Sequence, residues 1–244
     1  MELYILRHGT TEWNIEGLLQ GDHDTPLTDD GRELALETGR ALKEVTFDAC
    51  LTSPLSRAYE TAMLVLGDRL WTGKTTLTDE TLSVSDILAR KAADPAGPYA
   101  FDFRIDERIK EIDFGDWEGH HSRGEFREIT PEMLNRFFNI SDGHFHAPNG
   151  ESLNEIFART KAFLDDCFSN EEWEDKRVLV STHGGCLRAL LHHYWNDEDF
   201  WHGSVPPNCS ISVITAGHGR MVSLEADRIF YTREAVRYYP FDNR

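Results

Sequence analysis

The chain contains three short apolar runs, and these runs restrict the possible folds more than any other feature. Each ends in a polar turn that leads toward a segment with apolar residues at helical spacing. Residues 3–6, 48–52 and 177–182 are such runs, and Arg7 and His8 directly follow the first of them. Alternation of strands and helices along a chain predicts a mostly parallel sheet covered on both faces. We therefore expect an α/β fold, a three-layer α/β/α sandwich around this sheet with a small cap formed by insertions.

The remaining elements follow from helical spacing, capping residues and turn signals. Ser152 and Glu155 have the spacing of a capping box, and Pro54 is suited to the first turn of a helix. Two apolar segments separated by a glycine-containing turn near the C-terminus predict a hairpin. The predicted helices cover residues 29–45, 54–66, 83–93, 131–138, 152 onward and 186–194, and the hairpin strands cover 209–215 and 221–225.

One domain spanning residues 1–244 is the simplest organisation, because 244 residues with 40% hydrophobic content can bury a substantial core. Residues 67–104 contain several glycines and prolines, and residues 120–150 are mostly polar. We expect these two segments to be the insertions that form the cap.

The net charge, the N-terminal sequence and the cysteines exclude several classes of partner and site. A net charge of −18 argues against sequence-independent nucleic-acid binding, which needs a basic face. The chain has no apolar run long enough to span a bilayer, and its N-terminus lacks the features of a signal peptide. The four cysteines are scattered without a CxxC pair, so they predict neither a zinc site nor a disulfide framework. We expect a cytoplasmic protein with no membrane and no nucleic-acid partner.

Three strand ends carry residues suited to binding an anion. Ligands of open α/β sheets bind beyond the carboxyl ends of the strands, and these ends carry Arg7 with His8, a turn that leads to Arg57, and His183 with Gly184. The net negative charge repels a phosphate ester, so local arginines must create the positive pocket that would hold one.

Phosphoryl transfer is the chemistry that fits this set of residues. Guanidinium groups bind phosphate oxygens in bidentate fashion and stabilise the charge of the transition state. A neutral imidazole can attack phosphorus and form a covalent intermediate that water later cleaves, and His8 is the candidate. Taken singly, a loop histidine such as His8 is more often simply solvated, and His183 could be part of an ordinary turn before a helix.

Six segments occur in an order and with residues that resemble the histidine phosphatase superfamily, in its phosphoglycerate-mutase-like branch. The resemblance spans most of the chain, although residues 67–104 are longer than the family usually has between its arginine helix and its glutamate motif. The six segments are Arg-His-Gly-Thr-Thr-Glu-Trp-Asn at 7–14, Gly-Asp-His-Asp-Thr-Pro-Leu-Thr at 21–28, Ser-Pro-Leu-Ser-Arg-Ala at 53–58, Glu-Ile-Asp-Phe-Gly-Asp-Trp-Glu-Gly at 111–119, Gly-Glu-Ser at 150–152 and Ser-Thr-His-Gly-Gly at 181–185.

This resemblance implies a role for each matching residue. It implies a phosphohistidine at His8 and a proton donor at Glu111, with no metal and no cofactor. The residues that it implies in the phosphate and substrate pocket are Arg7, Arg57, His183, Asn14, Gln20, Gly21 and Gly184.

A carboxyl group is also required by the chemistry itself, since the departing alkoxide needs a proton and the attacking water must lose one. Without the motif, Glu111 would be taken for one of the many solvated carboxylates, and we expect that role for Asp113, Asp116 and Glu118. The histidine pairs at 120–121, 144 and 146, and 192–193 lack the spacing of metal ligands, so surface or cap roles are expected.

The resemblance is compatible with two activities, phosphatase and mutase, and the sequence also allows other classes of protein. The segment after Glu111 resembles the phosphatase members, and the arginine- and proline-rich segment of cofactor-dependent mutases is missing from the sequence. We therefore expect a phosphoric monoester hydrolase that acts on a small phosphorylated substrate. The alternatives are a cofactor-dependent phosphoglycerate mutase, a non-catalytic phospho-ligand-binding protein, and a metallohydrolase with His8 and His183 as ligands. The physiological substrate, and the choice between a monomer and a homodimer, stay open.

Overall fold

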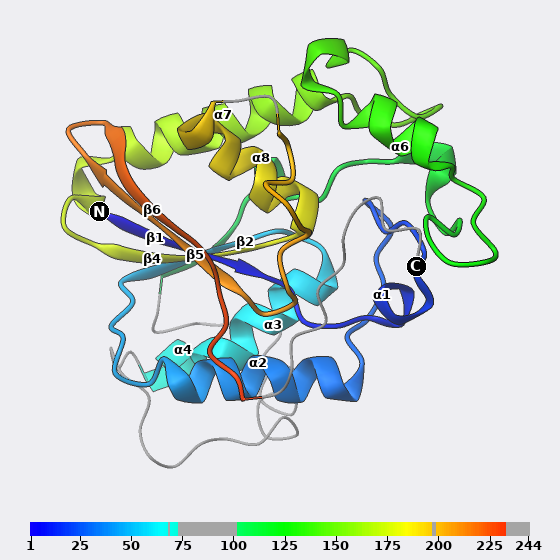
Figure 1. Ribbon diagram of the computed structural model, residues 1–244. Coiled ribbons are helices and arrows are strands. Elements are labelled where there is room, and N and C mark those ends of the chain that lie inside the picture. Colours follow the sequence, from blue (N-terminus) through cyan, green and yellow to red (C-terminus); the bar gives the residue numbers. More distant parts are fainter. Residues whose placement is uncertain (68, 73–101, 197–198, 233–244) are drawn as a thin grey trace.

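A six-stranded mixed sheet lies between two layers of helices (Figure 1). The computed structural model describes residues 1–67, 69–72, 102–196 and 199–232. The strand order is β3-β2-β4-β1-β5-β6, in which the first four strands are parallel and β5 and β6 are antiparallel to their neighbours. The strands are β1 (Glu2–Arg7), β2 (Ala49–Thr52), β3 (Asp102–Ile105), β4 (Arg177–Thr182), β5 (Ile211–Gly217) and β6 (Arg220–Arg228).

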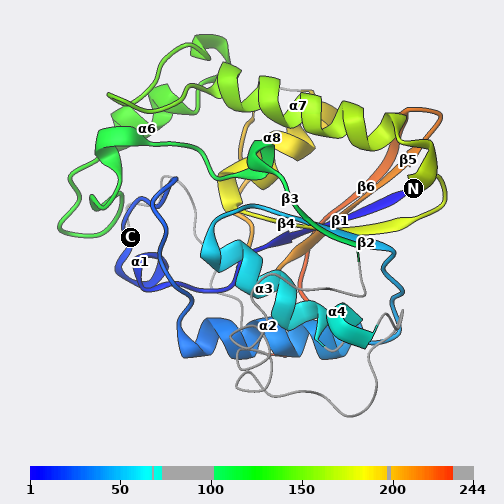
Figure 2. The same cartoon turned by 180° about the vertical axis from the view of Figure 1, so that it is seen from behind.

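Helices cover both faces of the sheet, and further short helices lie beyond the carboxyl ends of the parallel strands (Figures 1 and 2). One layer contains α2 (Asp29–Ala41), α3 (Ser56–Leu66) and α4 (Arg69–Thr72), and the other contains α7 (Leu153–Ser169) and α8 (Gly184–Trp195). Beyond the strand ends lie α1 (Glu12–Glu16) and α6 (Pro131–Phe137). In the described part of the chain there are also four 3-10 helices: η1 (Glu107–Ile109), η2 (Gly115–Trp117), η3 (Ile140–Asp142) and η4 (Glu171–Trp173).

The alternation of side chains along the central strands divides the core in two. On β4, Val178 and Val180 face the layer of α7 and α8, whereas Leu179 faces the layer of α2 and α3. All three side chains are fully buried, and each such burial contributes about 1.5–3 kcal/mol to folding. Because both faces are covered, the strand reads as a continuous apolar run in the sequence.

The predicted α/β fold class is confirmed, together with the C-terminal hairpin and the capping box of α7. Ser152 accepts a hydrogen bond from the Glu155 backbone N–H, and the Glu155 side chain accepts one from the Ser152 backbone N–H. Strand β3 was not predicted, because its polar sequence and its place at the sheet edge leave no apolar run. None of the described helices combines the length and apolarity needed to cross a bilayer.

One helix start was predicted wrongly. Pro54 lies before α3 rather than in its first turn, because Leu55 is the extended N-cap residue and the helix begins at Ser56. The Ser53 hydroxyl accepts a hydrogen bond from the Leu55 backbone N–H at 3.3 Å and so stabilises the turn ahead of the helix.

The segments predicted to form a cap differ in what the structure describes. The described parts of 67–104 are the C-cap of α3 at Gly67, helix α4 and most of β3, which belong to a helical layer and to the sheet, and the cavity described below is lined by other residues. Residues 73–101, including the predicted helix at 83–93, lie outside the described residues. Segment 120–150 contains α6 and supplies four residues of the cavity. The division into one domain with two cap insertions stays a prediction.

Candidate functional site

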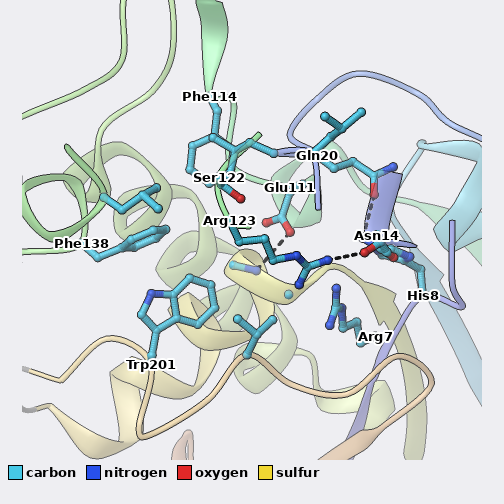
Figure 3. A pocket seen from close by; sticks show the side chains of 16 residues that line it. Arg7, His8, Asn14, Gln20, Glu111, Phe114, Ser122, Arg123, Phe138 and Trp201 are labelled. Atoms are coloured by element: carbon cyan, nitrogen blue, oxygen red, sulfur yellow. Dashed lines mark hydrogen bonds between the residues drawn. The ribbon is translucent and has the colours of Figure 1, made fainter. Parts of the chain in front are cut away.

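A cavity of about 140 Å³ opens beyond the carboxyl ends of the parallel strands (Figure 3). Six of the nine residues predicted for the site line it: Arg7, His8, Asn14, Gln20, Glu111 and Gly184. Of the other three, Arg57 and His183 are completely buried beside the cavity, and Gly21 contacts Arg57. The remaining lining residues are Leu18, Leu19, Phe114, Ser122, Arg123, Leu134, Phe138, Gly185, Trp201 and Val205.

His8 is held in a single tautomer at the end of β1. Its backbone N–H donates to the Thr182 carbonyl at 3.0 Å, which continues the pairing of β1 with β4. Its Nδ1 lies 2.7 Å from the Gly9 carbonyl oxygen. A carbonyl oxygen can only accept, so Nδ1 carries the proton and Nε2 keeps its lone pair. The imidazole is therefore oriented and unprotonated at the nitrogen that could attack an electrophile.

His183 brings the second imidazole against the first. It is the N-cap residue of α8, and its ring centroid lies 5.2 Å from that of His8. Its Nε2 lies 2.8 Å from the Ser53 hydroxyl oxygen at the end of β2. Within the described part of the chain its buried Nδ1 has no hydrogen-bond partner. Residues from the ends of three neighbouring strands thus meet at one point.

The surroundings keep both imidazoles uncharged. Burial lowers the pKa of His8 well below 6.5, and the positive charges of Arg57 and Arg7 lower it further. Burial and the positive charge of Arg57 lower the pKa of His183 in the same direction. Two neutral rings beside two guanidinium groups form a site suited to an anion.

Arg57 is held by the loop that follows Gln20. Its Nη2 donates to the Gly21 carbonyl at 2.6 Å and its Nη1 to the His23 carbonyl at 2.8 Å, while Asp24 lies 4.0 Å away. Burial lowers the pKa of Arg57 to about 10, so the group still carries its charge at neutral pH. Backbone carbonyls orient this guanidinium, and the negative charges of Glu111 and Asp24 partly balance its charge.

Glu118 holds the same loop and was predicted wrongly as a solvated carboxylate. Its Oε1 accepts from the Asp22 N–H at 2.8 Å and from the Phe114 N–H at 3.1 Å, and its Oε2 accepts from the His23 N–H at 2.8 Å. A Cβ at Gly21 would lie 2.0 Å from Glu118 Oε1, so only glycine fits there. The structure assigns Gly21 to this packing rather than to the cavity wall.

Asn14 and Gln20 form a connected set of amides at the cavity. The Asn14 side chain donates to Gln20 Oε1 at 3.2 Å and accepts from the Asn208 amide at 3.1 Å. Asn208, which was not predicted, also donates to the carbonyls of His8 and Gly9 at 3.0 and 3.1 Å. The amide of Asn208 therefore ties the histidine turn to α1.

Glu111 is held at the N-terminus of α8. Its carboxylate accepts backbone N–H bonds from Ile112 at 2.9 Å, Gly185 at 3.1 Å and Cys186 at 2.9 Å. A Cβ at Gly185 would lie 2.8 Å from Glu111 Oε1, so the glycine permits this close approach. The carboxyl group therefore has a fixed position on the cavity wall, at the N-terminus of α8.

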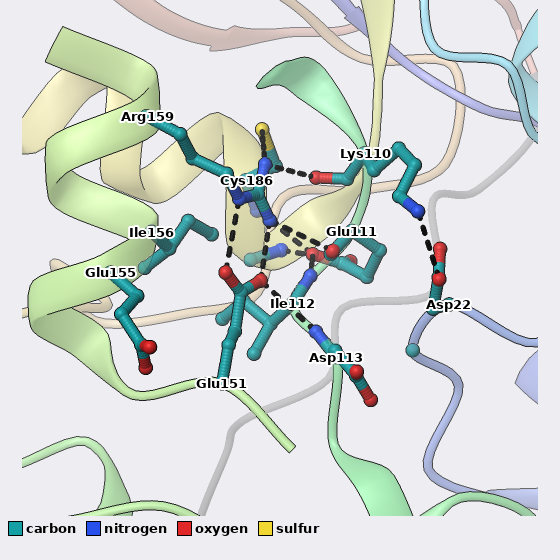
Figure 4. Close-up of polar contacts among 12 residues, drawn as sticks. Asp22, Lys110, Glu111, Ile112, Asp113, Glu151, Glu155, Ile156, Arg159 and Cys186 are labelled. Atoms are coloured by element: carbon teal, nitrogen blue, oxygen red, sulfur yellow. Dashed lines mark hydrogen bonds and ion pairs between the residues drawn. The ribbon is translucent and has the colours of Figure 1, made fainter. Parts of the chain in front are cut away.

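An ion pair beneath Glu111 holds the irregular segment that carries it (Figure 4). Arg159 on α7 pairs with Glu151 at 2.5 Å and donates to the backbone carbonyls of Lys110 and Glu111, each at 2.9 Å. Glu151 in turn accepts from the Asp113 N–H at 3.0 Å. Arg159 lies on the buried side of α7, and a charge among apolar helix positions was the sequence signal that could have revealed it.

The histidine pairs outside the cavity have packing or surface roles in the structure. His192 stacks on Phe157 with ring centroids 4.3 Å apart, and His193 Nε2 lies 3.0 Å from the Thr160 hydroxyl. His144 Nδ1 lies 3.2 Å from the Asn154 amide. Among the described residues, no three His, Cys, Asp or Glu side chains are grouped so that they could hold a metal ion.

Comparisons with known proteins agree with this geometry. Residues 3–82 and 88–227 match the family described as the histidine phosphatase superfamily, branch 1. The chain is 31% identical to a 2,3-bisphosphoglycerate-dependent phosphoglycerate mutase of Azorhizobium caulinodans, over 78% of this chain and 79% of the relative. It is 30% identical to the adenosylcobalamin/alpha-ribazole phosphatase of Escherichia coli, over 86% and 87%.

The fold of the chain is also similar to that of a solved structure. The alpha-ribazole phosphatase of Shigella flexneri superposes with a TM-score of 0.70 at 27% identity, covering 96% of this chain and all of that one. The family resemblance of the sequence motifs is thereby confirmed. The chain belongs to the histidine phosphatase superfamily, branch 1.

Proposed function

We propose that this protein is a phosphatase that hydrolyses phosphomonoesters through a phosphohistidine at His8. The observation that carries the proposal is the contact of two buried, neutral imidazoles, 5.2 Å apart, beside the guanidinium groups of Arg7 and Arg57. The family comprises phosphatases and mutases, so an acceptor for the phosphoryl group is common to both activities. The choice of phosphatase over mutase depends on the sequence and on the lining of the cavity.

The first step forms a bond between phosphorus and His8 Nε2. The lone pair of Nε2 attacks the phosphorus atom while the ester P–O bond breaks and its electrons leave with the alkoxide. Arg7 and Arg57 hold the peripheral oxygens, and His183 and Asn14 add further contacts. Glu111 gives its proton to the departing oxygen, so that the alcohol leaves neutral.

The second step regenerates the enzyme. Glu111, now a carboxylate, takes a proton from a water molecule, and that water attacks the phosphohistidine. The P–N bond breaks, its electrons return to Nε2, and inorganic phosphate leaves. The backbone N–H groups that face Glu111 stabilise the carboxylate in this half of the cycle.

Two features favour hydrolysis over isomerisation. The sequence lacks the arginine- and proline-rich segment of cofactor-dependent mutases, which a substrate with additional anionic groups would require. In addition, much of the cavity wall is apolar, so a bisphosphorylated ligand has few cationic partners there.

The test uses the purified full chain with p-nitrophenyl phosphate and with 3-phosphoglycerate. We expect phosphate release that survives a strong chelator, and no 2-phosphoglycerate even when 2,3-bisphosphoglycerate is added. Isomerisation faster than hydrolysis would establish the mutase instead. Loss of activity in the chelator would favour a metallohydrolase, and binding of phosphate esters without turnover would leave a non-catalytic role.

The neutral imidazoles also predict how stability depends on pH. The folded protein keeps His8 uncharged, whereas the unfolded chain binds a proton there below pH 6.5, so acid favours unfolding. Stability therefore rises with pH up to about 6.5 and is lost as the pH falls from there toward the lowered pKa. Each such group contributes at most about 1.4 kcal/mol per pH unit.

Urea unfolding between pH 5 and 7.5 measures this effect in the wild type and in His8→Gln, whose side chain does not titrate. We expect the wild type to lose more stability per pH unit than the variant below pH 6.5, and the two curves to run parallel above it. Parallel curves over the whole range would contradict the assignment of a lowered pKa to His8.

A further inference from the structure

The cavity has two unlike halves, and the second half has no role in the chemistry above. Figure 3 shows Phe138 and Trp201 across the cavity from His8 and Asn14. Building on the proposed phosphatase function, we propose that the substrates are phosphomonoesters whose alcohol carries a flat, uncharged, apolar group, and that this group binds against the aromatic side chains.

The aromatic wall consists of Phe114, Phe138 and Trp201. The rings of Phe138 and Trp201 pack edge to face with centroids 4.7 Å apart, and Phe114 lies 6.2 Å from Phe138 in a similar orientation. All three side chains are at least nine-tenths buried, and they come from three separate segments. The wall is therefore a fixed surface rather than a set of side chains that fold away.

Further packing behind the wall fixes its orientation. Phe138 also packs against Phe137 at 4.9 Å and Phe200 at 5.0 Å, and all of these residues belong to one hydrophobic cluster. Leu134 from α6 and Val205 complete the apolar lining on this side. An apolar group that enters meets a surface that is already ordered, which reduces the entropic cost of binding it.

The cationic side chains of the cavity are directed to its phosphate end. The lining residues with a permanent positive charge are Arg7 and Arg123. Arg7 donates a hydrogen bond to the Pro206 carbonyl, and Arg123 reaches across the cavity to donate one to the Asn14 carbonyl (Figure 3). The guanidinium of Arg123 thus lies beside the phosphate-binding residues and not against the aromatic wall.

This distribution of charge favours esters whose alcohol is apolar over esters whose alcohol carries a further negative charge. A carboxylate or second phosphate placed against the aromatic wall would lose its hydration without gaining an opposite charge. A phenyl-sized group placed there would instead exchange water for aromatic contacts. The preference for the apolar ester is expected to be about tenfold to a hundredfold in kcat/KM, the range typical of a small apolar group in a matching pocket.

The test compares 2-phenylethyl phosphate with glycerol 3-phosphate. Both are esters of primary alcohols, so the proton needed by the leaving oxygen is the same and the difference reports on binding of the alcohol. We expect kcat/KM at least about tenfold higher for 2-phenylethyl phosphate. Equal values, or a preference for glycerol 3-phosphate, would overturn the inference but leave the phosphatase in place. Absence of hydrolysis with both esters would overturn the proposed function itself.

Phe138→Ala tests the wall directly. We expect the ratio of kcat/KM values for the two esters to fall by about tenfold, mainly through a higher KM for 2-phenylethyl phosphate. The ratio does not depend on how much of the sample is folded. Phe163→Ala is the matched control, because Phe163 on α7 is fully buried in the same cluster but does not line the cavity. An unchanged ratio in Phe138→Ala, or equal falls in both variants, would contradict the wall as the binding surface.

Discussion

Replacing His8 by alanine is expected to abolish phosphate release, with a loss of at least about a thousandfold in kcat. The variant lacks the Nε2 lone pair that forms the covalent bond, and water would have to attack the ester directly. We do not expect the neighbouring His183 to substitute, because its corresponding nitrogen, Nε2, lies against the Ser53 hydroxyl at 2.8 Å. A phosphate-release assay with p-nitrophenyl phosphate measures the loss.

A labelling experiment complements the rate. With a ³²P-labelled ester and rapid quenching, we expect acid-labile label on the wild type and none on His8→Ala. His193→Ala is the control, since this half-buried imidazole lies on α8 in contact with Thr160, outside the cavity. It should keep both activity and label. Label that persists in His8→Ala would show that another residue accepts the phosphoryl group.

Glu111→Gln is expected to slow hydrolysis of an alkyl ester by about a hundredfold to ten-thousandfold, the usual contribution of a positioned general acid. The loss should be much smaller for p-nitrophenyl phosphate, because p-nitrophenolate leaves without a proton. The comparison of the two substrates therefore isolates proton donation from general damage to the site. Steady-state rates on 2-phenylethyl phosphate and p-nitrophenyl phosphate provide the measurement.

The backbone contacts of Glu111 make a structural control necessary. Its carboxylate accepts three backbone N–H bonds, and the amide of glutamine cannot replace all of them. Glu151→Gln disturbs the same segment through Arg159 and Asp113 but replaces no residue of the cavity lining. We expect Glu151→Gln to affect both substrates equally. Equal losses in Glu111→Gln as well would assign Glu111 a positioning role and leave the proton donor to be found elsewhere.

The sequence alone was sufficient for the fold class and for the residues at the chemical end of the cavity, although it did not reveal strand β3. Continuous apolar runs such as β4 identify strands buried on both faces, and the Ser152–Glu155 pair marks the start of α7, because these signals are local. The rule that ligands bind at the carboxyl ends of parallel strands then brought Arg7, His8 and His183 to one place. The motifs around these residues carry the resemblance to the family in the sequence itself.

How these groups are held, and which residues surround them, depends on contacts between segments that are distant in the sequence. Glu118 bonds backbone groups 95 and 96 residues away, and Asn208 bonds His8 at a separation of 200. The aromatic wall assembles Phe114, Phe138 and Trp201 from segments that have no common sequence pattern. A residue's local neighbours determine its secondary structure, whereas its hydrogen-bond partners and its exposure depend on which distant segments pack against it. The carboxylate of Glu118 therefore looked solvated in the sequence and proved to hold a loop in the fold.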